Sequence, residues 1–359
     1  MNILYDYQTF RNRFGGIARY HYELSKGLFN IGDENEIATL FTQNEYLLKD
    51  SLYRVWNPLG HKDFKGRYKL TNLIETLNRC YSIERIKNNK FDIFHPTYYN
   101  PYFIKYLKKP FVITVHDFVH EKYDPMRVED IANKRLLIEK ANKIIAISEN
   151  TKKDIIEYYN TPKDKIQVIY HGIHKAPTIY IKNNYGAYIL FVGDRNGYKN
   201  FRIFLKAAAI LLNNNQNLRL ICTGNPFSEE ECELIRSYGI IERVIQKSAN
   251  DLELNSLYKH ALVFVYPSLY EGFGMPILEA FSNNCPICIS NTSCFPEIAQ
   301  EAALYFDPFS VDSIASTIEK VMYNKELKNK LIKLGRKRAE SFSWEETLKK
   351  TQSLYHEIR

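Results

Sequence analysis

The chain has 359 residues, 45% of them hydrophobic and 25% charged, which is ordinary for a soluble globular protein with room for two separate cores. No apolar run approaches the roughly 18 residues that a membrane-spanning helix needs, and the six cysteines follow no disulfide framework. Composition therefore argues against a transmembrane protein and a disulfide-held scaffold. The lack of a visible signal peptide predicts a cytoplasmic protein.

The formal net charge of +8 lies mostly in the first 180 residues. A basic first half suits an anionic surface, so it allows peripheral contact with the inner membrane leaflet. Nucleic acid would also suit the charge. However, the sequence carries no signature of an RNA- or DNA-binding module, and we expect no nucleic-acid partner.

The first half predicts strands that alternate with helices, the pattern of a doubly wound sheet. Residues 2–7 are expected as the first strand, and Gly15-Gly16 lies between it and a helix that runs to about residue 29. A loop at this position binds ligands in doubly wound sheets, although any tight turn would also use two glycines. Three nearby arginines could meet a phosphate or lie on a solvated helix face: Arg11, Arg13 and Arg19.

A second strand is expected at 36–42, and the basic, aromatic stretch 45–90 follows it. Its basic cluster and Trp56 favour a surface that faces the membrane or an acceptor. The alternative is an ordinary pair of solvated helices, which would have a similar composition. The cluster consists of Lys62, Lys65, Arg67 and Lys69.

Further parallel strands are expected at 91–97, 111–117, 143–148 and 167–172, with Ser148 as the N-cap of a helix. His116 and Asp117 come at the end of one of these strands, where the ligand crevice of such a sheet lies. A lone histidine is more often structural, so both interpretations stay open for His116. The polar stretch 174–186 is predicted as an interdomain linker.

The second half repeats the pattern, starting with a strand at 188–192. The next loop carries Arg195 and Lys199 ahead of a helix at about 200–213, so two cations and free amides could hold a diphosphate. A solvated surface loop is the alternative. Cys285 and Cys288 match C-x-x-C, but they open an expected strand at 287–290, which argues against redox chemistry.

The most informative stretch runs from 261 to 280 and predicts a buried strand, a glycine loop and a helix. Amides near Gly274 and Met275 would point from the helix start toward a phosphate. Glu271 precedes the glycines, and Glu279 is expected in the first helical turn, so both can face the same ligand. A carboxylate beside a phosphate suits hydrogen bonds from sugar hydroxyls. The alternative is a solvated Glu271 and a Glu279 that only favours the helix start.

The wording EGFGMPILEA, with two glutamates eight positions apart, resembles the signature of the retaining glycosyltransferases of family four. Three further sequence motifs, GGIARY, VHD and GDR-x-GYKN, agree with that family in order and spacing, so the resemblance covers nearly the whole chain. It implies α/β GT-B architecture, with two Rossmann-like doubly wound domains facing across a cleft. We expect an acceptor-side domain, a linker, a nucleotide-sugar domain and a helix that crosses back, at 1–173, 174–186, 187–341 and 342–359.

The resemblance also implies roles for single residues. Glu271 contacts the transferred sugar, Glu279 holds the ribose, and His116 hydrogen-bonds the donor sugar. Asp117 orients His116 or helps the acceptor. The pyrophosphate is bound by Arg195 and Lys199, although this loop looks one residue shorter than usual and has Tyr198 where an arginine is common. The remaining donor contacts fall on Gly15, Gly16, Gly272, Phe273, Gly274, Met275 and Ile277.

The implied reaction moves a hexose, mannose or similar, from a GDP- or UDP-linked sugar to a growing glycan with retained configuration. The acceptor is expected to be a lipid-linked lipopolysaccharide or capsule precursor. With no D-x-D motif and no His/Cys cluster, we expect no cofactor and no catalytic metal. Same-face attack and a covalent intermediate on Glu271 both stay open. The alternatives are a GT-B sugar-nucleotide epimerase and a non-catalytic sugar-nucleotide-binding protein.

Overall fold

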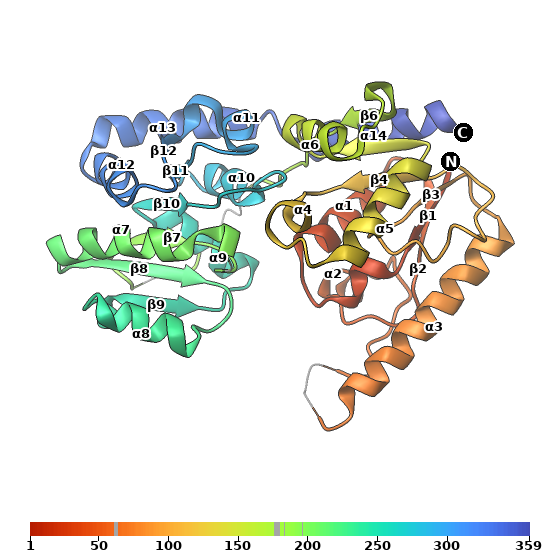
Figure 1. Cartoon of the computed structure of the whole chain (residues 1–359), viewed down its shortest axis with the longest axis horizontal. Helices are drawn as coiled ribbons and strands as arrows, with labels where there is room; N and C mark the ends of the chain where they lie inside the picture. The colour runs from red at the N-terminus through yellow and green to blue at the C-terminus, as the bar shows by residue number, and fades with distance from the viewer. Residues whose placement is uncertain (61–63, 176–179, 183, 196) are drawn as a thin grey trace. The chain divides into compact units, whose positions relative to one another are not determined.

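The computed structural model describes residues 1–60, 64–175, 180–182, 184–195 and 197–359 (Figure 1). Lys62 of the basic cluster, and positions 176–179 and 183 of the expected linker, lie outside the described residues. The chain forms two compact units, and each is considered by itself. Unit 1 comprises 1–171 and 344–359, and unit 2 comprises 172–343.

Unit 1 is built on parallel strands in the order β2-β1-β3 and β4-β5-β6, and a parallel bridge from Phe94 to Phe111 joins the two groups. The strands are β1 (Asn2–Asp6), β2 (Glu34–Ala38), β3 (Ile93–His95), β4 (Val112–Val115), β5 (Lys143–Ala146) and β6 (Ile166–Val168). The second strand begins and ends earlier than expected, because it pairs with β1 residue for residue from Asn2–Glu34 to Asp6–Ala38. Pairing with a neighbour, and not its own apolar run, sets its limits.

Helices connect the strands of unit 1, as crossovers between parallel strands require. They are α1 (Gly16–Asn30), α2 (Glu45–Lys49), α3 (Arg67–Asn88), α4 (Val119–Tyr123), α5 (Val128–Lys140), α6 (Glu149–Tyr159) and the 3₁₀ turns η1 (Gln8–Arg11) and η2 (Lys163–Lys165). Ser148 caps α6 as expected, with its hydroxyl accepting the Thr151 N–H at 3.0 Å.

The final helix, α14 (Trp344–Ile358), belongs to unit 1 and packs on α1. The contact is close, since a Cβ on Gly27 would lie 2.5 Å from Leu348 Cδ1. Tyr355 reaches the buried core, where its hydroxyl lies 2.6 Å from His95 Nδ1 and 3.3 Å from the Tyr5 hydroxyl. Trp344 packs against the same core.

Unit 2 holds one sheet of six parallel strands in the order β12-β11-β10-β7-β8-β9. The strands are β7 (Ala187–Phe191), β8 (Leu218–Thr223), β9 (Val244–Lys247), β10 (Val263–Tyr266), β11 (Ile287–Ser290) and β12 (Leu304–Phe306). The chain order reverses between β7 and β10, and the loops after these two central strands carry most of the predicted donor-site residues.

The helices of unit 2 flank the sheet, and the strand residues of its large apolar core lie on one face, since they occupy alternate positions such as Ile189 and Phe191. The helices are α7 (Phe201–Asn214), α8 (Glu229–Ser237), α9 (Asp251–His260), α10 (Met275–Ser282), α11 (Phe295–Ala299), α12 (Val311–Tyr323), α13 (Lys325–Ala339) and the 3₁₀ turns η3 (Gly197–Lys199), η4 (Ile241–Arg243) and η5 (Gln300–Ala302). Cys285 and Cys288 are buried free thiols at β11, and burial raises the pKa of both. This agrees with the strand expected there.

Candidate functional site

Two loops of unit 2 meet at an ion pair between Lys199 and Glu271. Lys199 Nζ lies 2.7 Å from Glu271 Oε1, and only 17% and 13% of the two side chains are exposed. The Tyr198 carbonyl, one residue before Lys199, accepts the Leu269 N–H at 2.8 Å. The backbone therefore ties the loop after β7 to the loop after β10, and the two predicted ligand residues are brought together.

The surroundings of the pair favour its charged form. Burial works to lower the pKa of Lys199, but the Glu271 carboxylate outweighs it, and the pKa is raised. The ammonium also lies over the rings of Tyr198 and Tyr266, at 5.1 and 5.7 Å from their centroids. The Tyr266 hydroxyl hydrogen-bonds Glu271, and burial followed by that carboxylate keeps the pKa of Tyr266 well above its ordinary value.

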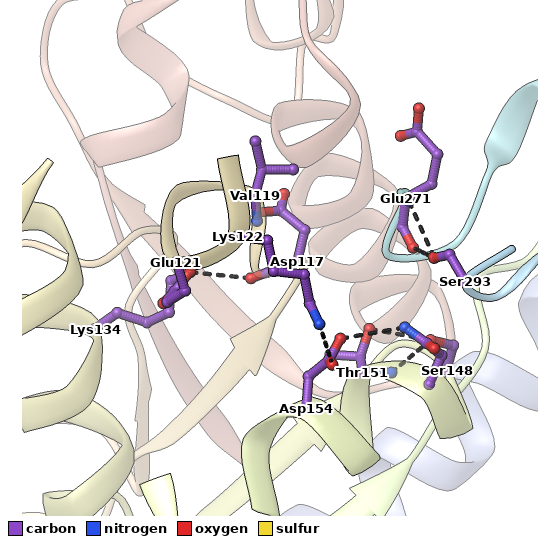
Figure 2. Close-up of polar contacts among 11 residues, drawn as sticks. Asp117, Val119, Glu121, Lys122, Lys134, Ser148, Thr151, Asp154, Glu271 and Ser293 are labelled. Carbon is purple, nitrogen blue, oxygen red and sulfur yellow. Dashed lines mark hydrogen bonds and ion pairs between the residues drawn. The ribbon is translucent and has the colours of Figure 1, made fainter. Parts of the chain in front are cut away.

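The backbone of Glu271 is held by a residue that sequence reasoning missed. Ser293, in the loop after β11, accepts the Glu271 N–H at 3.1 Å and donates its hydroxyl to the Glu271 carbonyl at 2.5 Å. In Figure 2 the Glu271 carboxylate points away from Ser293. The signal that could have found Ser293 is its place just after a parallel strand, the rule that singled out His116 and Lys199.

The start of α10 lies directly after Glu271 in the chain. Gly274 has φ +85°, and a Cβ there would come within 3.1 Å of Ile277 Cδ1 and 3.2 Å of Phe295 Cε1. The helix has no side-chain N-cap. Conformation and packing thus require glycine here, and the helix start keeps its dipole unscreened by a capping side chain. The Ile277 N–H, expected to contact the donor, bonds the Gly274 carbonyl at 2.9 Å.

Glu279 lies one residue beyond the first turn of α10, in which it was predicted. Because the helix starts at Met275, Glu279 is its fifth residue, and the first turn contains no acidic side chain. The Tyr258 hydroxyl donates to Glu279 Oε2 at 3.3 Å. This position argues against the alternative in which Glu279 only favours the helix start, and its expected role at the ribose stays a prediction.

Arg195 contacts a different set of groups from Lys199. Its guanidinium is 2.7 Å from Glu231 Oε1, donates to the carbonyls of Asn225 and Pro226 at 2.8 and 2.9 Å, and lies 4.7 Å from the Phe227 ring centroid. One buried nitrogen, Nη1, has no hydrogen-bond partner among the described residues. Its predicted contact with pyrophosphate stays a prediction, and its present contacts anchor the N-terminal end of α8.

In unit 1, His116 follows β4 and is 7% exposed. Its backbone N–H donates to the Tyr99 hydroxyl at 3.0 Å, and its Nε2 has no partner among the described residues. The ring meets Tyr20 edge-on at 5.3 Å and stacks on His171 at 6.0 Å. Burial, with smaller effects of His95 and Lys134, lowers the pKa of His116 to about 3, so the imidazole stays neutral and can exchange hydrogen bonds with an uncharged hydroxyl.

A buried network supports the segment that carries His116 and Asp117. Lys134 is 1% exposed, donates to the Asp117 carbonyl at 2.9 Å and forms an ion pair with Glu121 at 2.9 Å (Figure 2). The Tyr159 hydroxyl donates to Glu121 at 2.5 Å. The Asp117 side chain accepts the Val119 N–H at 3.1 Å. Its carboxylate thus begins α4, a local contact that sequence reasoning did not anticipate.

Gly15 and Gly16 lie at the start of α1 in unit 1. A Cβ built on either glycine would meet no atom within 4 Å, so packing within the protein does not require glycine at these positions. Gly15 has φ +157°, a conformation that other residues rarely adopt, so its backbone favours glycine, whereas close approach of a ligand remains a reason for Gly16. Arg11 and Arg13 form exposed ion pairs with Glu75 and Glu45, which fits the solvated alternative for both.

Two kinds of feature are absent from the described residues. No helix there is long and apolar enough to cross a membrane. No group of three or more His, Cys, Asp or Glu in the described part of the chain is placed to hold a metal ion.

Family models match almost the entire chain. Residues 14–176 match the model described as Glycosyltransferase Family 4, and residues 175–338 match the model described as Glycosyl transferases group 1. The chain belongs to glycosyltransferase family four. Its resemblance to that family, first seen in EGFGMPILEA, is confirmed.

Relatives of this glycosyltransferase agree in length as well as sequence. The chain is 28% identical to O-antigen chain mannosyltransferase B of Escherichia coli, over 99% of each chain. Among solved structures it is similar to Anabaena HepE in complex with UDP-glucose, with a TM-score of 0.78, 13% identity and all of both chains covered. It is also similar to WaaG, a glycosyltransferase involved in lipopolysaccharide biosynthesis, with a TM-score of 0.74, 16% identity and 99% of each chain covered. The predicted GT-B fold is confirmed.

Proposed function

We propose that this glycosyltransferase transfers a hexose, mannose in the first instance, from a GDP- or UDP-linked sugar to a lipopolysaccharide-type glycan acceptor. The observation that carries the proposal is the buried Lys199–Glu271 pair beside the uncapped start of α10. The name of the Escherichia coli relative, an O-antigen chain mannosyltransferase, supports mannose and a surface glycan. The UDP-glucose bound by HepE supports a nucleotide-sugar donor.

The pair explains how a carboxylate can lie beside a diphosphate. Alone, Glu271 would repel the donor, but the ammonium of Lys199 compensates its charge at 2.7 Å. When donor binds, Lys199 turns its charge toward the phosphates and Glu271 accepts hydrogen bonds from sugar hydroxyls. As the glycosidic bond breaks, negative charge grows on the diphosphate, and Lys199 and the α10 dipole stabilise it without reorganisation.

We also propose that transfer retains the anomeric configuration of the sugar and needs no metal ion. The acceptor hydroxyl attacks the anomeric carbon from the face that the diphosphate leaves, and its proton passes to the leaving phosphate oxygen. The bond to the acceptor forms as the bond to the diphosphate breaks. Neutral His116 would exchange a hydrogen bond with a sugar hydroxyl, the role proposed for it. Lys199 and the helix start supply the positive charge that a metal ion would otherwise supply.

The test is turnover of purified protein with GDP- and UDP-linked hexoses and an oligosaccharide-lipid acceptor, in EDTA and in Mg²⁺. The anomeric configuration of the product is read by NMR. We expect one sugar nucleotide to be consumed in EDTA, with product of the donor's own configuration. An inverted product, or turnover only with added metal, contradicts the mechanism. Consumption that yields an isomerised sugar nucleotide instead of a glycan would identify an epimerase.

For the acceptor side, we propose that α3 rests on an anionic membrane that presents the lipid-linked acceptor. The buried residues of α3 lie at four-residue spacing on one face, Asn78, Ser82 and Ile86. Outside them the helix exposes a leucine stripe and, nearby, basic side chains: Leu70, Leu73, Leu77, Lys65 and Lys69. Apolar side chains that enter a membrane interface and lysines that meet anionic headgroups form a recognised combination.

A further inference from the structure

Ser293 holds both backbone polar groups of Glu271, although 22 positions separate the two residues. Its hydroxyl accepts the Glu271 N–H at 3.1 Å and donates to the Glu271 carbonyl at 2.5 Å (Figure 2). A single side chain that satisfies both groups of one residue fixes the orientation of the two peptides around it. The direction in which Glu271 leaves the backbone is therefore set from the loop after β11.

The conformation of Ser293 has an energetic cost. Its φ is +56°, in the left-handed region that serine rarely adopts, at a cost of roughly 1 kcal/mol. Glycine would adopt this conformation without that cost, but glycine has no hydroxyl to offer Glu271. Strain of this kind persists where surrounding contacts and a function maintain it.

A second contact joins the same two loops. The Thr292 hydroxyl donates to the Ser268 carbonyl at 3.4 Å, so the loop after β11 meets the loop after β10 at both ends of the Glu271 segment. Lys199 holds the other end of the residue, at the carboxylate. Glu271 is thus fixed at its backbone by Ser293 and at its carboxylate by Lys199.

We propose that Ser293 is a positioning residue for transfer, one that aims the Glu271 carboxylate at the donor sugar. The inference rests on the proposed function, because it takes Glu271 to bind the sugar. Because Ser293 holds the backbone of Glu271, its effect should reach the sugar through that residue and leave recognition of the nucleotide diphosphate unchanged.

Two substitutions separate positioning from stability. Ser293→Ala removes the hydroxyl and keeps the strain, whereas Ser293→Gly removes both. We expect both variants to lose turnover by roughly tenfold, as a displaced carboxylate would, while Ser293→Gly is the more heat-stable of the two. Activity that instead follows stability, with Ser293→Gly close to wild type, would overturn the proposal. Thr292→Val is the matched control and should keep most of its turnover.

Binding gives a readout independent of turnover. The measured quantity is the ratio of dissociation constants for the intact nucleotide sugar and for the nucleoside diphosphate alone. We expect Ser293→Ala, Ser293→Gly and Glu271→Ala to change this ratio by a similar factor, roughly tenfold, with diphosphate binding within about twofold of wild type. In a Glu271→Ala background, Ser293→Ala should add nothing further.

The two proposals fail differently. If the wild type consumes no nucleotide sugar, the proposed function is contradicted, and if Glu271→Ala keeps wild-type sugar binding and turnover, the role of Glu271 is contradicted. If Glu271→Ala loses both while the Ser293 variants behave like wild type, the proposed function stands and the role of Ser293 is overturned.

Discussion

Tyr198 and Leu269 are joined by a backbone hydrogen bond of 2.8 Å, which links the loop after β7 to the loop after β10. The bond immediately precedes Lys199 and lies two residues before Glu271. Because it is made by main-chain atoms, it holds the two loops together whatever the side chains do. Lys199 is thus held within 2.7 Å of Glu271 by the backbone of its loop, and a positive charge fixed in place in this way is what electrostatic stabilisation of a leaving group requires.

Replacing Lys199 tests that stabilisation. We expect Lys199→Met to lower kcat by about 10² to 10³, the usual cost of losing one preorganised group at developing charge. Lys199→Arg should recover part of the rate, because it restores charge but not geometry. Arg202→Met is the control, since Arg202 lies on α7 in an exposed pair with Glu230. A Lys199→Met enzyme within a few-fold of wild type would contradict the assignment.

The ion pair should also affect stability. Lys199→Met leaves Glu271 in a largely buried position without its cation, which should lower the free energy of unfolding of unit 2 by about 2 kcal/mol. The double variant Lys199→Met/Glu271→Leu should recover most of that loss, because no buried charge is left unpaired. Calorimetry is the suitable measurement, because both tryptophans of the chain, Trp56 and Trp344, belong to unit 1. A double variant less stable than either single variant would argue against this account.

Arg195 should act differently from Lys199. Its contacts with Glu231 and two carbonyls predict that Arg195→Met mainly lowers the thermal stability of unit 2, with turnover reduced less than in Lys199→Met. The comparison is kcat and melting temperature of the two variants side by side. An equal loss of kcat, with stability unchanged, would support the predicted pyrophosphate contact of Arg195 instead.

Unit 1 should lose stability in mild acid. Burial is the main cause that lowers the pKa of each of four imidazoles, His21, His95, His116 and His171. Below about pH 6.5 these four imidazoles become protonated in the unfolded chain but stay neutral in the folded chain. The unfolding free energy is therefore fully present above that pH and falls as pH drops toward about 3, by up to about 1.4 kcal/mol per pH unit for each imidazole.

Urea unfolding followed by tryptophan fluorescence, which reports unit 1, measures this slope. His21→Leu should have a shallower pH dependence than wild type between pH 6.5 and 4, whatever its stability at pH 7. Identical slopes in the two proteins would mean that His21 is not held neutral by burial.

Membrane contact through α3 predicts binding to vesicles of anionic lipid. Replacing Leu70, Leu73 and Leu77 with serine should weaken binding to such vesicles by about a hundredfold or more, measured by co-sedimentation, since each buried leucine contributes about 1 kcal/mol or more. Phe309→Ser is the control, because Phe309 is 69% exposed but lies in unit 2. Equal binding of all three proteins, or binding that ignores lipid charge, would contradict this role for α3.

The rule that ligands bind at the carboxyl ends of parallel strands predicted much of the site. Lys199, Glu271 and His116 each follow a parallel strand, and the sheet order brings the first two together. Contacts between residues that lie far apart in the chain could not be predicted from the sequence. Glu231 draws Arg195 toward α8, and Ser293 reaches Glu271 from a loop with no recognisable motif. Such contacts depend on how loops close after packing, which local propensity does not encode.

The ends of the helices and strands likewise differ in how well the sequence predicted them. Two strands of unit 2, β7 and β11, were predicted to within one residue, because each is a short apolar run that is almost entirely buried. The second strand of unit 1 was predicted too late, because pairing with β1 sets its register. The start of α10 was predicted at the right place, next to Gly274, but Glu279 was assigned to the first turn although it lies one residue beyond it.

Ligand-induced thermal stabilisation of wild type and Lys199→Met, in EDTA, tests the central claim most directly. The ligands are GDP, UDP, dTDP, ADP and CMP. We predict that GDP or UDP stabilises the wild type, by about 2.7 kcal/mol at a hundredfold excess over its dissociation constant, and that Lys199→Met loses most of this gain. Stabilisation by none of them, or an equal gain in the variant, would contradict a metal-free diphosphate site at Lys199.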